Sequence, residues 1–278
     1  MVRKGLMSVT VVLWCLFLIV PKPAAGENYI EILDQGRIDW TNGFIEAMGV
    51  GAPPPNPLNP AHARAVAENH ATIAARRNLL EIVKNIRVNS ETRVLDHMAA
   101  KEMSEKALET LLIDAKTVDL SYERDEKVGV KLSMKLQGSL AEFMLPEDIL
   151  IISTVKQPKE QAQKEEPFTG LIVDCKGVSL EPAVVPLILD EDGAILYGPA
   201  FVSREHAVER RMASYVRETA SAESDLRVGS NPLKVKGIRT FEGKACDVMI
   251  SHADAARIRG LASNFNFLHQ CRVLLVVD

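Results

Sequence analysis

A segment without large apolar side chains, residues 156–167, divides the chain. It reads KQPKEQAQKEEP, contains no aliphatic residue larger than alanine and carries prolines near both of its ends. A segment of this composition cannot bury enough apolar surface to fold and is typical of a solvated linker. We therefore predict two small domains, residues 27–155 and residues 168–278, joined by residues 156–167.

The first 26 residues have the pattern of a signal peptide. Arg3 and Lys4 precede an apolar run from Val9 to Val20, and small residues follow up to Gly26. The run is shorter than the roughly 20 residues that a membrane-spanning helix needs. We predict that residues 1–26 direct export and are cleaved before Glu27; the alternative is an uncleaved N-terminal anchor.

Cys15 does not fit a lipid-attachment site. It lies in the middle of the apolar run and follows Leu13 and Trp14, whereas a lipoprotein signal places small residues directly before its cysteine. We therefore expect a periplasmic protein without lipidation and without a transmembrane span after signal cleavage. Outer-membrane association or peripheral membrane contact is left open.

The net charge disfavours nucleic acid as a partner. The full chain has a formal charge of −4, and this becomes −7 when Arg3, Lys4 and Lys22 leave with the signal peptide. An acidic protein without a basic cluster binds the phosphate backbone poorly. We predict no nucleic-acid partner.

A hairpin is predicted around Asn42-Gly43. This dipeptide suits a two-residue type I′ turn, because both of its positions need a positive φ. The turn would place Trp40 opposite Ile45 and Ile38 opposite Ala47. Four apolar side chains then share the face toward the core: Ile38, Trp40, Ile45 and Ala47.

Gly49-Val50-Gly51 resembles the start of a phosphate-binding loop, but three prolines follow it where a helix with free N–H groups should begin. We predict instead a bend or close packing of the backbone where the strand leaves the sheet.

The rest of the first domain alternates helices and strands. A long helix is predicted from Pro60 to Ile86, with Asn59 as its N-cap, and its larger apolar residues, Val66 and Ile73 among them, should pack on the sheet. The further predicted elements are helices at 104–114 and 139–144 and strands at 117–122, 128–136 and 149–155.

The second domain ends in the run Arg272 to Val277, which predicts a strand buried on both faces. The other predicted strands are 169–175, 186–189, 194–197, 234–239 and 244–250, and the predicted helices are 203–219 and 252–262. The fold class is therefore α+β, with two small domains that are each a mostly antiparallel sheet packed with helices.

The histidines and acidic residues form no recognisable metal motif. His62 and His70 point to different sides of the long helix, and the remaining histidines are scattered: His97, His206, His252 and His269. Asp190-Glu191-Asp192-Gly193 lacks the spacing of a calcium loop, so we predict a hairpin turn, with incidental surface cation binding as the alternative.

Nucleophile motifs are equally sparse. Ser203 near His206 is explained as a helix cap. Cys175, Cys246 and Cys271 have no CxxC spacing, which leaves either one disulfide with one free thiol or three buried thiols. The arginines from Arg204 to Arg217 are interleaved with glutamates, as on a solvated helix face. We assign no catalytic, cofactor-binding or metal-binding residue and expect no cofactor.

Residues 30 to 155 resemble an LPP20-type domain. The resemblance lies in Gly49-x-Gly51, the proline-rich step after it, and an alanine-rich helical run with Ala67, Ala71, Ala74, Ala75, Arg77 and Leu80. That domain is similar to the N-terminal domain of flagellar assembly protein T, a component of the H ring around the flagellar basal body. The second half, with TGLIVDCKG and CRVLLVVD, resembles a companion domain of such proteins.

The resemblance implies a non-enzymatic protein that acts through envelope or flagellar protein partners, and it carries over no catalytic residue. The leading hypothesis is thus a structural or accessory component of the bacterial cell envelope. An alternative is a periplasmic binding module that holds a peptide, lipid or glycan at the domain junction. A third hypothesis, an enzyme, would require Cys175, His206 and Asp174 to converge in a cleft.

Overall fold

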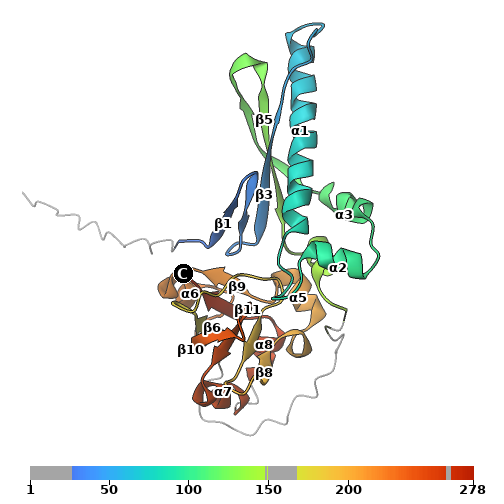
Figure 1. Cartoon of the computed structure of the whole chain (residues 1–278). Coiled ribbons are helices and arrows are strands. Elements are labelled where there is room, and N and C mark those ends of the chain that lie inside the picture. The colour runs from blue at the N-terminus through green and yellow to red at the C-terminus, as the bar shows by residue number, and fades with distance from the viewer. Residues whose placement is uncertain (1–26, 148, 150–167, 261–263) are drawn as a thin grey trace, which may run out of the picture.

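The computed structural model describes residues 27–147, 149, 168–260 and 264–278 (Figure 1). The predicted signal peptide, the predicted linker and all but Ile149 of the predicted strand 149–155 lie outside the described residues.

The first domain contains a sheet in which every pairing is antiparallel. Its strands lie in the order β1-β2-β3-β5-β4. Their bounds are β1 (Ile30–Leu33), β2 (Gly36–Asp39), β3 (Phe44–Gly51), β4 (Lys116–Tyr122) and β5 (Val128–Lys135). A 3-10 turn, η1 (Arg124–Glu126), joins β4 to β5.

Helix α1 (Pro60–Lys84) lies along β3 and β5, and these elements extend away from the second domain (Figure 1). The predicted cap is confirmed, because the Oδ1 atom of Asn59 accepts a hydrogen bond from the backbone nitrogen of His62 at 2.8 Å. The shorter helices are α2 (Val94–Ala100), which was not predicted, α3 (Glu105–Leu112) and α4 (Ser139–Met144).

Glycine and alanine let β3 and α1 approach closely. A Cβ atom on Gly49 would lie 2.2 Å from the backbone nitrogen of Ala75, and one on Gly51 would lie 2.0 Å from the carbonyl oxygen of Ala67. The predicted close packing of the two glycines is therefore confirmed. The prediction that Ile73 packs on the sheet is wrong: its side chain is 59% exposed, and the buried residues of α1 that face β3 at this level are Ala67, Ala71 and Ala75.

The β2–β3 hairpin differs from the predicted one. Ile38 pairs with Ile45 and Asp39 with Phe44, so the connection is the four-residue loop 40–43, and the type I′ turn with its register is wrong. The shift is by two residues, which keeps each side chain on its predicted face. The four core residues are buried as predicted: Ile38, Trp40, Ile45 and Ala47.

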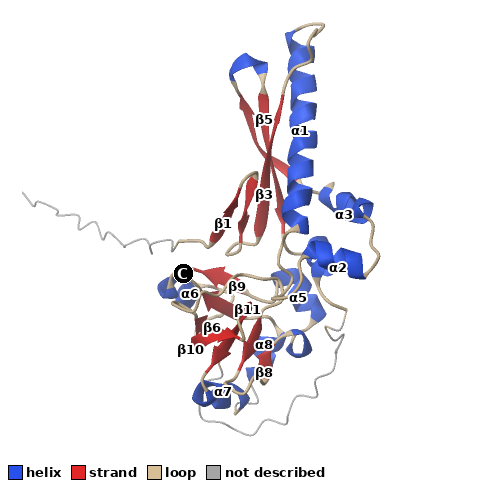
Figure 2. Ribbon diagram, viewed as in Figure 1, coloured by secondary structure: helices blue, strands red, loops and turns tan. Residues whose placement is uncertain are grey.

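The second domain contains a mixed sheet in the order β8-β7-β11-β10-β6-β12-β9. The strands are β6 (Gly170–Asp174), β7 (Leu187–Leu189), β8 (Ile195–Tyr197), β9 (Ser214–Val216), β10 (Pro232–Phe241), β11 (Lys244–Ile250) and β12 (Val273–Val276). The helical segments are η2 (Pro199–Phe201), α5 (Arg204–Arg210), α6 (Thr219–Ser224), α7 (His252–Arg259) and α8 (Asn264–His269). Figure 2 shows helices around this sheet.

Strands β6 and β12 are neighbours in the second sheet, between β10 and the edge strand β9, and they pair in parallel. Ile172 and Leu274 belong to the cluster that includes Ala222 of α6, whereas Leu171 and Leu275 belong to the main core on the other face. The prediction of a strand buried on both faces is confirmed for β12. The α+β class with two sheets is also confirmed, although the second sheet is mixed, because apolar strands covered on both faces favour parallel pairing.

The predicted helix 203–219 is wrong beyond Arg210. Arg211 has φ 66° and ψ 157°, a conformation outside the helical region, and the chain then forms the edge strand β9. Among the described residues, every helix falls short of the length and apolar character needed to span a membrane.

Candidate functional site

The most distinctive arrangement of polar side chains lies where the two domains meet. The connection between β2 and β3, residues 40–43 and here called the junction loop, faces the second domain (Figure 2). Trp40 is buried and its ring meets that of Tyr215 edge to face, with 5.8 Å between centroids. Side chains of both domains form one continuous hydrophobic core.

Arg211 fastens the junction loop to the second domain. Its Nη1 atom donates to the carbonyl oxygen of Trp40 at 2.5 Å, and Nη2 donates to that of Thr41 at 2.9 Å. Ser214 also donates to the Thr41 carbonyl, at 2.8 Å, while the hydroxyl of Thr41 donates to the carbonyl of Tyr215 at 2.6 Å. Residues 211–215 of the second domain thus bind both backbone and side-chain groups of the loop.

The acceptors of the hydrogen bonds from Arg211 to the junction loop are carbonyl oxygens, which carry no full charge. Only 8% of the residue is exposed, and its Nε atom is buried without a hydrogen-bond partner. Burial lowers the pKa of the guanidinium, and the neighbouring Arg227 lowers it further. Arginine stays protonated at neutral pH, so each donor that Arg211 directs at the loop makes a charge-assisted hydrogen bond.

Backbone hydrogen bonds join the domains at two further places. Val184 donates to the carbonyl of Arg87 at 3.0 Å, and Val185 donates to that of Val88 at 2.8 Å. On the other side of the junction, Gly138 donates to the carbonyl of Val208 at 2.9 Å. Main-chain groups of both domains thus satisfy each other where the junction excludes water, as buried backbone groups require.

Ion pairs surround these contacts. Arg204 pairs with Glu142 at 2.8 Å and Lys244 with Glu91 at 2.8 Å, each across the junction. Solvent screens ion pairs at the surface, so they contribute little to holding the domains together. The interpretation of Arg204 to Arg217 as one solvated helix face is wrong, because Arg204 and Arg211 contact the first domain. The sequence did not predict that Arg211 is buried, because it follows two exposed charged residues, Glu209 and Arg210.

The described residues enclose a small cavity at the junction. One cavity of about 10 Å³ is lined by Trp40, Arg211 and apolar side chains, and that volume fits a single water molecule. An open groove of about 790 Å³ lies outside it, lined by Lys101, Met103, Glu142, Phe143, Glu147 and Arg204. Its cations are paired with its carboxylates, Lys101 with Glu147 at 2.9 Å and Arg204 with Glu142.

The turn Asp190–Gly193 is a hairpin turn between β7 and β8, as predicted. One carboxylate oxygen of Asp190 accepts hydrogen bonds from the backbone nitrogens of Asp192 at 3.0 Å and Ala194 at 2.8 Å. The other accepts a hydrogen bond from Arg259, which holds the pKa of Asp190 below its usual range. The carboxylate is thereby engaged in holding the turn.

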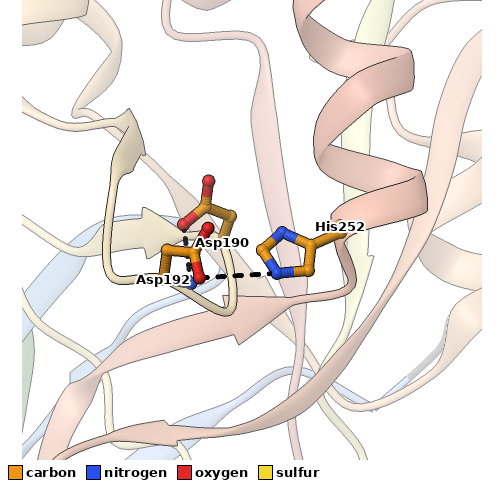
Figure 3. Close-up of side chains that lie close together, drawn as sticks. All are labelled: Asp190, Asp192 and His252. Carbon is orange, nitrogen blue, oxygen red and sulfur yellow. Dashed lines mark hydrogen bonds and ion pairs between the residues drawn. The ribbon is translucent and has the colours of Figure 1, made fainter.

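His252, at the start of α7, faces this turn (Figure 3). Its Nε2 atom lies 3.6 Å from a carboxylate oxygen of Asp192. The described residues contain one group of three side chains that could hold a metal ion: Asp190, Asp192 and His252. Each offers one ligand atom, and these atoms lie within 4.8 Å of one another. The Arg259 cation on Asp190 opposes the binding of a metal cation there.

Four other histidines lie away from this turn, two in α1 and two that contact each other in the second domain. His62 and His70 lie near the start of α1, where His70 Nδ1 lies 3.1 Å from the carbonyl oxygen of Ala52. His206 of α5 and His269 of α8 meet edge to face with 6.0 Å between ring centroids. Within the described ranges, no third metal-binding side chain completes a cluster with this pair.

The three cysteines in the described part of the chain, Cys175, Cys246 and Cys271, are buried and free, so three buried thiols are found rather than a disulfide. Burial raises the pKa of Cys246 and of Cys271 to about 11, and it raises that of Cys175 further. A thiol is nucleophilic as its thiolate, so these residues are poorly suited to nucleophilic catalysis at neutral pH. Ser203 occupies the N-cap position of α5 as predicted, but its side chain makes no capping hydrogen bond.

Comparison with known proteins finds a described domain that is similar to the C-terminal part of the chain. No curated protein matches the chain. Residues 170–278, which contain the entire mixed sheet, match the family model described as Treponema pallidum Tp0624, second domain, so this part of the chain is similar to that domain.

Proposed function

We propose that the protein is an exported, non-enzymatic structural or accessory component of the bacterial cell envelope that acts through protein–protein contacts. The observation that carries the proposal is the junction, where Arg211 binds a loop of the first domain inside the second. A junction of this kind holds two domains in one fixed arrangement, as a scaffold requires.

The fixed arrangement supports an arm, defined as residues 48–76 of β3 and α1 and residues 116–131 of β4 and β5. It extends away from the second domain (Figure 1). The arm carries a set of exposed large apolar side chains: Met48, Val50, Leu58, Ile73, Val118, Leu120 and Tyr122. Exposed apolar side chains gathered on one part of a protein are typical of a protein-contact surface.

Site-specific crosslinking in cells tests the arm as the contact surface. A photo-crosslinking residue would replace Ile73, and a matched variant would carry it at Leu226, which is 93% exposed in the second domain. We expect Ile73 to capture a defined envelope protein, identified by mass spectrometry, that Leu226 does not capture. Capture of the same proteins from both positions would count against the arm as the contact surface.

The flagellar form of the proposal rests on the resemblance of residues 30 to 155 to the LPP20-type domain and through it to flagellar assembly protein T. Deletion of the gene should then alter the basal-body rings, which can be seen in images of isolated basal bodies. Normal motility with intact rings would exclude a flagellar role and leave the general envelope role standing.

Export is tested separately. Fractionation should place the protein in the periplasm, and N-terminal sequencing should find Glu27 as the first residue. A chain that keeps residues 1–26 would support the uncleaved anchor instead.

A second candidate function is the binding of a peptide, lipid or glycan at the junction. The groove beside Phe143 and Met103 is the observation in its favour, since about 790 Å³ lies in the range of small-molecule sites. Because its charged groups already pair with each other, a ligand would have to replace those pairs. A thermal-shift screen with short peptides and glycans would support this function if a hit lost its effect in Phe143→Ala.

A further inference from the structure

The junction loop contains Asn42-Gly43, a sequence prone to spontaneous deamidation. In this reaction the backbone nitrogen of the glycine loses its proton and attacks the Cγ atom of the asparagine. The bond from Cγ to Nδ2 breaks, ammonia leaves and a cyclic imide remains. Water then opens the imide to aspartate or isoaspartate. A glycine after the asparagine favours the reaction, because no side chain hinders the attacking nitrogen.

The folded loop ties down both reacting groups. The Gly43 nitrogen donates to the carbonyl oxygen of Asp39 at 2.7 Å, so its proton is engaged. The Nδ2 and backbone nitrogen atoms of Asn42 donate to the two carboxylate oxygens of Asp39, each at 2.8 Å. The carbonyl of Gly43 accepts a hydrogen bond from Leu136 at 2.9 Å. The attack requires that the hydrogen bonds of the Gly43 nitrogen and of the Asn42 Nδ2 atom break.

The same loop is held in place by the second domain. The carbonyls of Trp40 and Thr41, directly before Asn42, accept the hydrogen bonds of Arg211. Gly43 is also buried against that arginine, because a Cβ atom built on Gly43 would lie 2.7 Å from Nε of Arg211. Asn42 itself is exposed, so the second domain restrains the reaction through the backbone groups on either side of this residue.

We propose that Asn42 is a modification site gated by the domain junction: it deamidates in molecules whose junction has opened, and the product prevents the junction from closing again. A carboxylate at position 42 would face the carboxylate of Asp39 where the amide now donates to it. Isoaspartate would also insert a methylene group into the backbone next to the carbonyls that bind Arg211. The first change replaces an attraction within the loop by a repulsion, and the second displaces the carbonyls that Arg211 binds in the closed junction.

Peptide mapping by mass spectrometry measures the reaction directly. The mature protein would be incubated at mildly alkaline pH in its folded state, in denaturant, and as the variants Arg211→Ala and Arg76→Ala. Arg76 is an exposed arginine of the arm and serves as the matched control. Deamidation at Asn42 would be followed over time in each sample.

We expect the folded protein and Arg76→Ala to react about tenfold to a hundredfold more slowly than the unfolded chain, because charge-assisted hydrogen bonds must first break. Arg211→Ala should react faster than Arg76→Ala. Equal rates in the folded and unfolded protein, or a folded Arg211→Ala variant that reacts as slowly as the control, would overturn the proposal.

A variant that fails to fold would not decide the matter, so the unsubstituted protein provides a second test. Its rate would be measured in denaturant below the unfolding transition. If the junction gates the reaction, the rate should rise together with the fraction of molecules in which Trp40 is exposed to solvent. A rate that stays constant while Trp40 becomes exposed would also overturn the proposal.

Discussion

Replacing Arg211 should weaken the association of the two domains. In Arg211→Ala the carbonyl of Trp40 loses the donor at 2.5 Å, while that of Thr41 keeps the Ser214 hydroxyl at 2.8 Å. A buried carbonyl without a partner costs about 1–3 kcal/mol, and losing the second charge-assisted hydrogen bond adds to this cost. The loss is partly offset because a buried cation no longer has to be desolvated. We expect the free energy of unfolding to fall by about 2–4 kcal/mol.

The mature protein offers a probe at the site of the change. The sequence contains two tryptophans, and the predicted signal cleavage removes Trp14, so Trp40 becomes the single tryptophan. Its fluorescence reports on the junction, while circular dichroism reports on the whole fold. In the unsubstituted protein both signals should change in one transition, because the two domains share a core. In Arg211→Ala the Trp40 signal should change at lower denaturant concentration.

Two further variants make the test decisive. Arg76→Ala, on the arm, should unfold like the unsubstituted protein. Arg211→Gly should be more stable than Arg211→Ala by about 1 kcal/mol, because glycine adopts a φ of 66° without steric cost. If Arg211→Ala unfolds at the same denaturant concentration as the unsubstituted protein, with unchanged Trp40 emission, the assigned role of Arg211 is wrong.

Three other changes have defined outcomes. Gly49→Ala should lower the free energy of unfolding by about 1–3 kcal/mol, since its methyl group would overlap the backbone of α1, whereas Gly260→Ala at the exposed end of α7 should have a small effect in the same denaturation assay. Burial lowers the pKa of His97 in the folded protein, and the charge of Lys101 lowers it further. The contribution of His97 to the free energy of unfolding should therefore be fully present above its unfolded pKa and be lost as the pH falls toward the folded pKa. His97→Gln should flatten this part of a stability-versus-pH curve. A protease site engineered into residues 156–167 should yield two fragments that still elute together in gel filtration, since the contacts of the junction lie outside that segment.

The first domain shows what a hydrophobic pattern can and cannot predict. Alternation of apolar and polar residues correctly placed Ile38 and Ile45 on the core face, because a sheet has only two faces. The register of the β2–β3 pair was predicted wrongly, because the preference of Asn-Gly for a two-residue turn takes no account of contacts outside the hairpin. In the folded chain, residues 40–43 form a longer loop whose carbonyls are used by Arg211, a residue far away in the sequence.

The second domain was predicted best where burial is complete. The run from Arg272 to Val277 predicted a covered strand, and β12 lies inside the mixed sheet between β6 and β9 with all four of its residues buried. Arg211 was misinterpreted for the opposite reason. Its neighbours Glu209 and Arg210 are exposed and charged, so local composition favoured a solvated helix, and the partners that bury Arg211 lie in the other domain. A buried charge is specified by tertiary contacts, which no local pattern contains.

The composition of residues 156–167 and the contacts at the junction lead to different predictions of whether the two domains move independently. A polar linker by itself favours domains that move independently. The described contacts argue against this, because the junction loop, the backbone pairs at Val184 and Val185, and the shared core fix the first domain on the second without using the linker. The orientation of the arm is then set by Arg211 and its partners, so a partner bound to the arm would be held at a fixed distance and angle from the second domain. Loss of Arg211 should therefore impair the proposed scaffold role even though every surface residue of the arm remains in place.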